Sequence, residues 1–226
     1  MTIAAKYAVH QAAETLQDLS YRRWPVAELV RYLNDGRREI LVSRPDALAA
    51  PVAVTLVDGA RQTLPAGSVK LLEVRRNLGG SQRVIRQCGR EMLDALDPDW
   101  MGTARATEIL HFTYDPRTPR DFYVYPPAQV GLTVEAVCST LPANIAEPVG
   151  VATHDDVVGD IGVPDILVNA LVNYMLYRAY AKDSESPSSA ARAQAFYTAF
   201  VAGLGTEVSA TVTVGPTTRS TPMSST

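Results

Sequence analysis

The chain has 226 residues, of which 46% are hydrophobic, enough to fill the core of one large domain or two small ones. Its 21 basic and 24 acidic residues leave a formal net charge of -3, which excludes an overall positive field for holding nucleic acid. Two cysteines without CxxC spacing, Cys88 and Cys138, exclude a disulfide framework and favour a reducing compartment. The sequence has no signal-peptide pattern and no uninterrupted apolar stretch of roughly 20 residues, so we expect a soluble cytoplasmic product with no membrane partner.

Helical periodicity marks the beginning of the chain. Between Ile3 and Leu19, Ala and Leu recur at helical spacing without Gly or Pro, which predicts a first helix. A second helix is expected after Pro25, which suits a first helical turn, and Pro45 ends it. Its apolar stripe comprises Val26, Leu29, Val30, Leu33, Ile40 and Leu41.

The middle of the chain reads as short strands separated by Pro and Gly. This spacing predicts a small antiparallel sandwich or barrel, with one short helix at Gly89–Leu96 and a turn at Asp115–Pro119. The expected strands are Val52–Val57, Gln62–Leu64, Val69–Arg75, Arg83–Gln87, Ile109–Tyr114, Phe122–Tyr125 and Leu132–Cys138.

Helical periodicity returns after Pro164. A third helix, apolar on several sides around Leu171, is expected to be buried, and a fourth follows from Ala193, with Gly203 and Gly205 as its stop. The predicted fold class is therefore α+β: an antiparallel four-helix bundle with an inserted small antiparallel β domain and an extended C-terminal tail. The expected parts are the bundle halves 1–48 and 158–205, the β domain 49–157 and the tail 206–226.

The C-terminal tail is rich in Thr and Ser and carries one acid and one base. Such a segment alone would be disordered, yet a period of two predicts a strand without a partner. We expect another subunit or protein to bind this strand by strand addition, although it could instead complete the chain's own β domain. The apolar residues of the predicted strand are Val208, Ala210, Val212 and Val214.

One cluster of residues has side chains suited to metal binding and hydrolysis. His154, Asp155 and Asp156 could bind a divalent cation and serve a small metal-dependent hydrolase. Their spacing matches no specific ligand pattern, and aspartates before a helix act more often as caps. No other motif predicts a catalytic residue, a metal or a cofactor, so we do not expect an enzyme.

Arginines gather around a predicted hairpin, with no acid between Val74 and Arg90. Arginine is favoured at protein interfaces, so we rank a contact with a neighbouring subunit above a solvated face, and both above a DNA-binding module. The cluster comprises Arg75, Arg76, Arg83, Arg86 and Arg90.

Several blocks of the sequence, of which Tyr21–Ile40 is the first, resemble the head-to-tail adaptor proteins of short-tailed bacteriophages. The longest block runs from Tyr21 to Ile40 and continues at Ser43–Ala47. Two further blocks lie in the expected third and fourth helices. The further blocks are Arg75–Gly79, Leu96–Trp100, Leu171–Glu185 and Ala190–Tyr197. The resemblance covers roughly residues 20–205, and the tail from Thr206 is not part of it.

The resemblance implies a virion structural protein made in the host cytoplasm. Its copies would form a ring of twelve beneath the portal protein, with the tail nozzle protein docked below and double-stranded DNA passing through without sequence-specific binding. It implies no cofactor and no catalytic residue. A neck or head-completion protein of a long-tailed phage remains the alternative, since only the partner bound would separate the two.

Overall fold

The computed structural model describes residues 3–182 and 187–214, with side chains as far as Gly205. The chain forms two compact units. The helical unit contains residues 3–36, 145–161 and 165–214, and the β unit contains residues 37–144 and 162–164. The α-helices are α1 Ala5–Leu16, α2 Val26–Ser43, α3 Arg90–Leu96, α4 Val168–Lys182 and α5 Pro187–Val214, joined by the short 3-10 helices η1 Pro45–Leu48, η2 Trp100–Gly102, η3 His154–Asp156 and η4 Asp165–Leu167.

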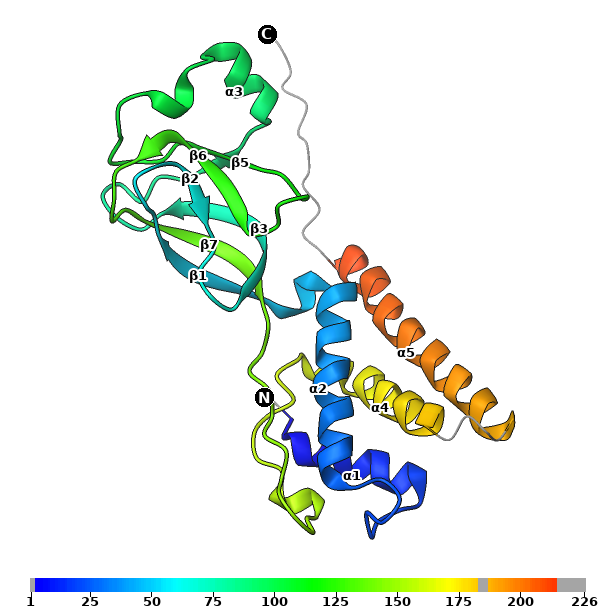
Figure 1. The fold of residues 1–226 in the computed structure, drawn as a ribbon. Helices are drawn as coiled ribbons and strands as arrows, with labels where there is room; N and C mark the ends of the chain where they lie inside the picture. The colour runs from blue at the N-terminus through cyan, green and yellow to red at the C-terminus, as the bar shows by residue number, and fades with distance from the viewer. Residues whose placement is uncertain (1–2, 183–186, 215–226) are drawn as a thin grey trace. The chain divides into compact units, whose positions relative to one another are not determined.

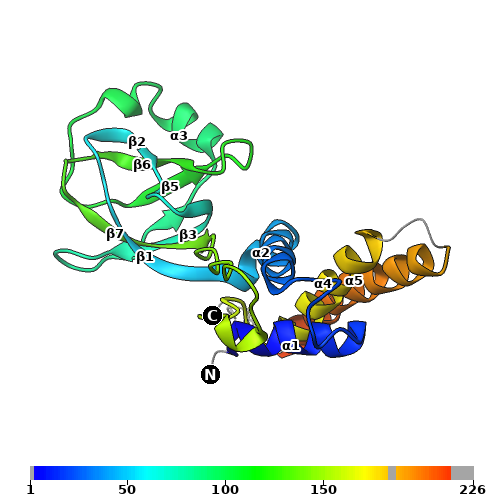
Figure 2. The same ribbon diagram turned by 60° about the horizontal axis from the view of Figure 1, so that its bottom comes forward.

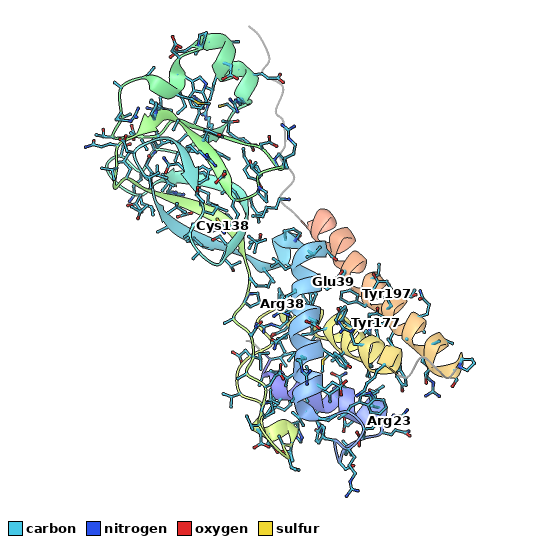
Figure 3. The ribbon with its side chains drawn as sticks, viewed as in Figure 1. Arg23, Arg38, Glu39, Cys138, Tyr177 and Tyr197 are labelled. Atoms are coloured by element: carbon cyan, nitrogen blue, oxygen red, sulfur yellow. The ribbon has the colours of Figure 1, made fainter. Side chains whose placement is uncertain are left out.

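Helices α4 and α5 form a hairpin within the helical unit and lie side by side in both ribbon views (Figure 1 and Figure 2). Aromatic rings pair between them. Tyr180 stacks on Phe196 with 5.6 Å between ring centroids, and the ring centroids of Tyr177 and Tyr197 lie 5.0 Å apart. Figure 3 labels Tyr177 on α4 and Tyr197 on α5. Because offset and edge-to-face aromatic pairs stabilise beyond simple burial, these contacts fix the register of the hairpin.

Helix α2 approaches α4 closely at Gly36. A Cβ atom placed on this glycine would lie 2.8 Å from Leu171 Cδ1 and 2.9 Å from Tyr174 Cδ1. Two ion pairs also join α2 to α4. Arg178 Nη1 donates to Asp35 Oδ2 at 3.1 Å, and Lys182 Nζ donates to Glu28 Oε2 at 2.8 Å. The absence of a side chain at Gly36 therefore permits the two helices to pack at this distance.

An irregular segment, residues 145–161, completes the core of the helical unit. Its Val157 and Ile161 are buried. Two backbone hydrogen bonds of 2.9 Å join it to the residues around the start of α1: Ala5 N donates to Gly159 O, and Ile161 N donates to Ile3 O. The buried Asn34 holds its first residue by donating to Ile145 O and accepting from Ile145 N. Backbone groups that lack a regular partner are thus satisfied individually.

Two sheets make up the β unit. The first has the order β1-β7-β3, with β1 Ala49–Thr55, β7 Thr133–Thr140 and β3 Ser68–Asn77, and all its pairs are antiparallel. The second has the order β2-β6-β5-β4, with β2 Gly59–Thr63, β6 Asp121–Ala128, β5 His111–Tyr114 and β4 Arg86–Gln87, and its β4–β5 pair is parallel.

One apolar cluster joins the two sheets. It is formed by inward-facing residues of both, because alternate residues of a strand point to the same face. A second, smaller cluster of Ala60, Leu93 and Trp100 packs α3 and η2 against Tyr123 and Tyr125. The main cluster includes Val54, Leu56, Leu71, Val74, Ile85, Ile109, Phe112, Phe122, Val124, Val134, Ala136 and Cys138.

Local predictions for the middle of the chain are confirmed. Each of the expected strands overlaps one of β1–β7, and the expected short helix is α3. The expected turn at Asp115–Pro119 lies between β5 and β6, with Thr118 N donating to Asp115 O at 3.0 Å. These elements are set by local sequence, because turn residues and alternating apolar residues act over a few positions.

The predicted four-helix bundle with a small inserted β domain is wrong. The described residues contain five α-helices and two sheets of three and four strands, which is a mixed α+β fold. Apolar stripes show that a helix buries one face but not what covers it. Here α1 packs on both α4 and the η3 segment, α2 ends in the β unit, and the β unit holds a helix of its own.

The predicted extended tail is also wrong where the structure describes it, since α5 continues as a helix to Val214. The expected stop at Gly203 fails because this glycine serves helix packing: a Cβ there would lie 3.2 Å from Ala170 Cβ on α4. The alternation of Val208, Ala210, Val212 and Val214 therefore does not produce a strand. The rest of the predicted tail, residues 215–226, lies outside the described residues.

No helix in the described part of the chain is both long and apolar enough to cross a bilayer.

Candidate functional site

Four arginines of the predicted cluster lie on one hairpin-like segment of the β unit, residues 75–87, here called the arginine hairpin, and the fifth, Arg90, begins α3. The hairpin comprises the end of β3, a turn containing Gly79 and Gly80, and β4. Gly80 has a φ of +60°, a backbone conformation that glycine adopts without a Cβ clash. The segment closes through Asn77 N to Arg83 O at 3.0 Å and Ile85 N to Arg75 O at 2.9 Å.

A buried asparagine anchors the arginine hairpin to the β unit. The Asn77 amide donates to Arg83 O at 3.0 Å and to Ile109 O at 2.9 Å, and its oxygen accepts from Ile109 N at 2.9 Å. Asn77 is 4% exposed and Ile109 is fully buried. A buried backbone group without a hydrogen bond is costly, so this amide fixes the position of the turn.

Three arginines of the cluster have acidic partners within the chain. Arg75 contacts Glu73 Oε2 at 3.1 Å and Glu135 Oε1 at 3.5 Å, and the hydrogen bond from Arg75 to Glu73 raises the pKa of the guanidinium. Arg83 lies 3.9 Å from Glu108 and Arg90 lies 3.4 Å from Asp94. Glu73 and Asp94 are close to their arginines in sequence, whereas the fold brings Glu135 and Glu108 from distant positions, so each of these three arginines has an acidic partner.

Arg76 and Arg86 differ from the other three. Both are exposed, and neither has an ion pair or side-chain hydrogen bond within residues 3–182 and 187–205. Arg76 pairs with Val84 across an isolated bridge, and Arg86 follows Val84 by two positions. Directly paired residues share a face, as do residues two apart on a strand. The two arginines therefore flank Val84, whose side chain is 61% exposed.

The model of the SU10 adaptor protein family matches residues 7–223 of this chain. The chain belongs to the SU10 adaptor protein family. The match extends beyond the blocks that carry the resemblance, and it confirms the prediction of a phage head-to-tail adaptor. No protein with a curated description matches the sequence.

Membership identifies a structural adaptor of a bacteriophage, a protein of the virion, and families of this kind are not typically enzymes. The adaptor's sequence blocks lie in both compact units: Tyr21–Ile40 extends along α2, and Arg75–Gly79 lies in the arginine hairpin. The family model thus matches residues of both compact units rather than of one alone.

The three candidate metal ligands, His154, Asp155 and Asp156, make other contacts in the adaptor. His154 Nδ1 lies 3.0 Å from the Tyr21 hydroxyl, and its ring stacks on His10 with centroids 4.2 Å apart. Asp155 pairs with Lys6 at 3.2 Å, while Asp156 accepts from Thr153 N at 2.7 Å as part of a capping box. No group of three His, Cys, Asp or Glu side chains in the described ranges could hold a metal.

Sequence reasoning missed the buried amides that position irregular backbone. Asn34 holds Ile145, Asn77 holds Ile109, and Gln62 donates to Val57 O and Gly59 O. A signal was present for Asn34, because it lies one helical turn after Val30 on the buried face of α2. A polar residue at a buried helical position indicates a specific hydrogen-bond partner.

The predicted apolar contact residues of the tail, Val208 to Val214, are part of α5. Their side chains lie outside the described part of the chain. Their role in an interface stays a prediction.

Proposed function

We propose that this chain forms a homo-oligomeric ring, of twelve copies, between the portal protein and the tail nozzle protein. The ring lengthens the portal exit, provides a platform for the tail, and leaves a channel for double-stranded DNA. The observation that carries this proposal is the match of residues 7–223 to an adaptor family. Closed rings of identical subunits use heterologous contacts, so each copy needs two different surfaces that complement each other.

The charge distribution supports passage of DNA without tight binding. The net charge is -3, and acids within the fold pair with Arg75, Arg83 and Arg90. A channel with strong positive charge would hold phosphates and make the release of DNA depend steeply on salt. We propose that the arginine hairpin contacts a protein subunit rather than the passing DNA.

The decisive measurement is the mass of the purified protein, alone and mixed with its phage's portal protein, by native mass spectrometry or light scattering. We expect a large complex with a fixed ratio of adaptor to portal. A chain that stays monomeric with the portal present would contradict the proposal. A ring that binds a neck protein of a long-tailed virion instead would favour the head-completion alternative.

We also propose that the end of the chain, including Val208, Ala210, Val212 and Val214, contacts the portal or a neighbouring subunit. Deletion of residues 206–226 is expected to abolish assembly on the portal, because this segment is rich in apolar and hydroxyl side chains and nearly free of charge. The deletion removes only the end of α5 and leaves the aromatic pairs with α4 in place. Circular dichroism should therefore show a folded protein, and normal assembly by that protein would contradict the proposed contact.

A further inference from the structure

A second surface of the chain has the features expected of the complement to the arginine hairpin. It lies in the helical unit, on residues 149–160 of the irregular segment, here called the valine loop. This loop exposes Val149, Val151 and Val158, whose exposed fractions are 97%, 108% and 80%. Isolated surface valines are common, but three almost fully exposed valines within one short loop indicate an apolar contact surface.

The valine loop is held in its middle and at its end, and the chain is also anchored at Ile145, four residues before it. Asn34 fixes Ile145 before it, the capping box of Thr153 and Asp156 closes η3 within it, and Asp160 forms an isolated β-bridge with Ala4 at its end. Long irregular segments of this kind are typically functional rather than mere connections. Because its backbone is tied down, the loop can bind without the entropic cost of ordering a mobile segment.

Acidic side chains accompany the exposed valines. Asp155 pairs with Lys6, and Asp156 is used in the capping box. Asp160 is exposed, and its carboxylate has no ion pair or hydrogen bond to any side chain described in residues 3–182 and 187–205. The loop thus combines exposed valines with at least one free negative charge.

The arginine hairpin also exposes a valine, but its charged side chains are positive. Its exposed Val84 lies between Arg76 and Arg86, which have no acidic partner in the described chain. Apolar groups on both surfaces would be removed from water by contact, and arginines would meet carboxylates. Each copy carries both surfaces, one in each compact unit, as a heterologous ring contact requires.

We propose that the arginine hairpin of one copy binds the valine loop of the next copy around the ring. Val84 packs against the exposed valines, and Arg76 and Arg86 lie against Asp160. This inference rests on the proposed ring, and it identifies the two surfaces that close it. DNA is a poorer occupant of the hairpin, since phosphates would leave Val84 exposed to water.

Charge reversal tests the contact. The double variant Arg76→Glu/Arg86→Glu and the single variant Asp160→Arg are each expected to weaken assembly on the portal by roughly tenfold or more, because like charges then face each other. The matched control is Arg61→Glu/Arg117→Glu, with the same change in net charge at two exposed arginines elsewhere in the β unit. Their ion pairs are exposed and contribute little, so this control should assemble as the wild type does.

An equimolar mixture of the two defective variants decides whether the contact joins different copies. In an alternating ring, the Glu-bearing hairpin meets the Arg-bearing loop, and the unchanged hairpin of the Asp160→Arg copy meets an unchanged loop. Assembly should therefore return in the mixture, and native mass spectrometry should find both variants in equal amounts. A contact within one chain would not be restored, because each variant is mismatched with itself.

The outcomes separate this inference from the proposed function. If the wild type assembles and the hairpin double variant assembles equally well, the ring stands and the hairpin–loop contact is overturned. Failure of the mixture to exceed either variant alone also overturns it. If the wild type forms no complex with the portal, the proposed function and this inference are both overturned.

Discussion

Replacing Gly36 with valine is expected to lower the free energy of unfolding by about 3 kcal/mol, because overpacking a core typically costs about 1–3 kcal/mol and sometimes more. The Cβ atom alone would lie within 3.0 Å of both Leu171 and Tyr174. Leu171 is fully buried and Tyr174 is 7% exposed, so neither can move freely into solvent. Valine is only slightly better than glycine in a helix, which leaves the clash uncompensated.

The same substitution at Gly205 provides the control. This glycine is also in a helix, is exposed, and has no described atom within 4 Å of the position that a Cβ atom would take. Gly205→Val should change the free energy of unfolding by less than about 0.5 kcal/mol, as is usual for surface substitutions. Denaturant unfolding followed by circular dichroism measures both variants. Equal effects at the two positions would show that the close approach of α2 and α4 does not depend on Gly36.

Local structure could be predicted from the sequence far better than the arrangement of the helices. The strands between Ala49 and Thr140 follow from alternating apolar residues, and Pro and Gly mark their ends. The arrangement of the helices could not be predicted, and the four-helix bundle was wrong, because a stripe such as Val26–Leu41 specifies a buried face without specifying its partner. Residues 145–161 lack periodicity, yet they cover part of the helical core.

The end of α5 shows a different limit. The alternation from Val208 to Val214 predicted a strand, and Gly203 predicted a helix stop. In the structure the helix continues through Gly203, and this glycine instead lets α5 pack closely against α4. A glycine that lets helices approach and a glycine that ends a helix are identical in sequence. Only the position of Ala170 on α4 distinguishes the two.

The candidate contact surface was predicted in part. The sequence identified the arginines, because no acid interrupts the run from Arg75 to Arg90. It could not identify which of them are free, since Glu108 and Glu135 approach through the fold from distant positions. The valine loop was missed for the same reason: Val149 and Val157 look alike in sequence, and only their exposure separates a contact surface from core.

Asn77→Ala is expected to destabilise the β unit by about 2–6 kcal/mol, because each buried backbone group left without a partner costs about 1–3 kcal/mol. Two such groups are at stake, the N–H and the C=O of Ile109, which is fully buried. The Arg83 carbonyl keeps its bond from the Asn77 backbone, so the turn itself is not left unsatisfied. Denaturant unfolding measures the change.

Asn144→Ala is the matched control for that substitution. Its amide oxygen accepts one hydrogen bond, from Arg38 at 2.8 Å, at an exposed site where water can replace the donor. This variant should lose less than about 0.5 kcal/mol. An equal loss in the two variants would mean that Asn77 does not hold the buried segment. If the expected difference is found, the arginine hairpin owes its position to a side chain at the end of β3, and Asn77→Ala should weaken ring assembly at temperatures where the protein is still folded.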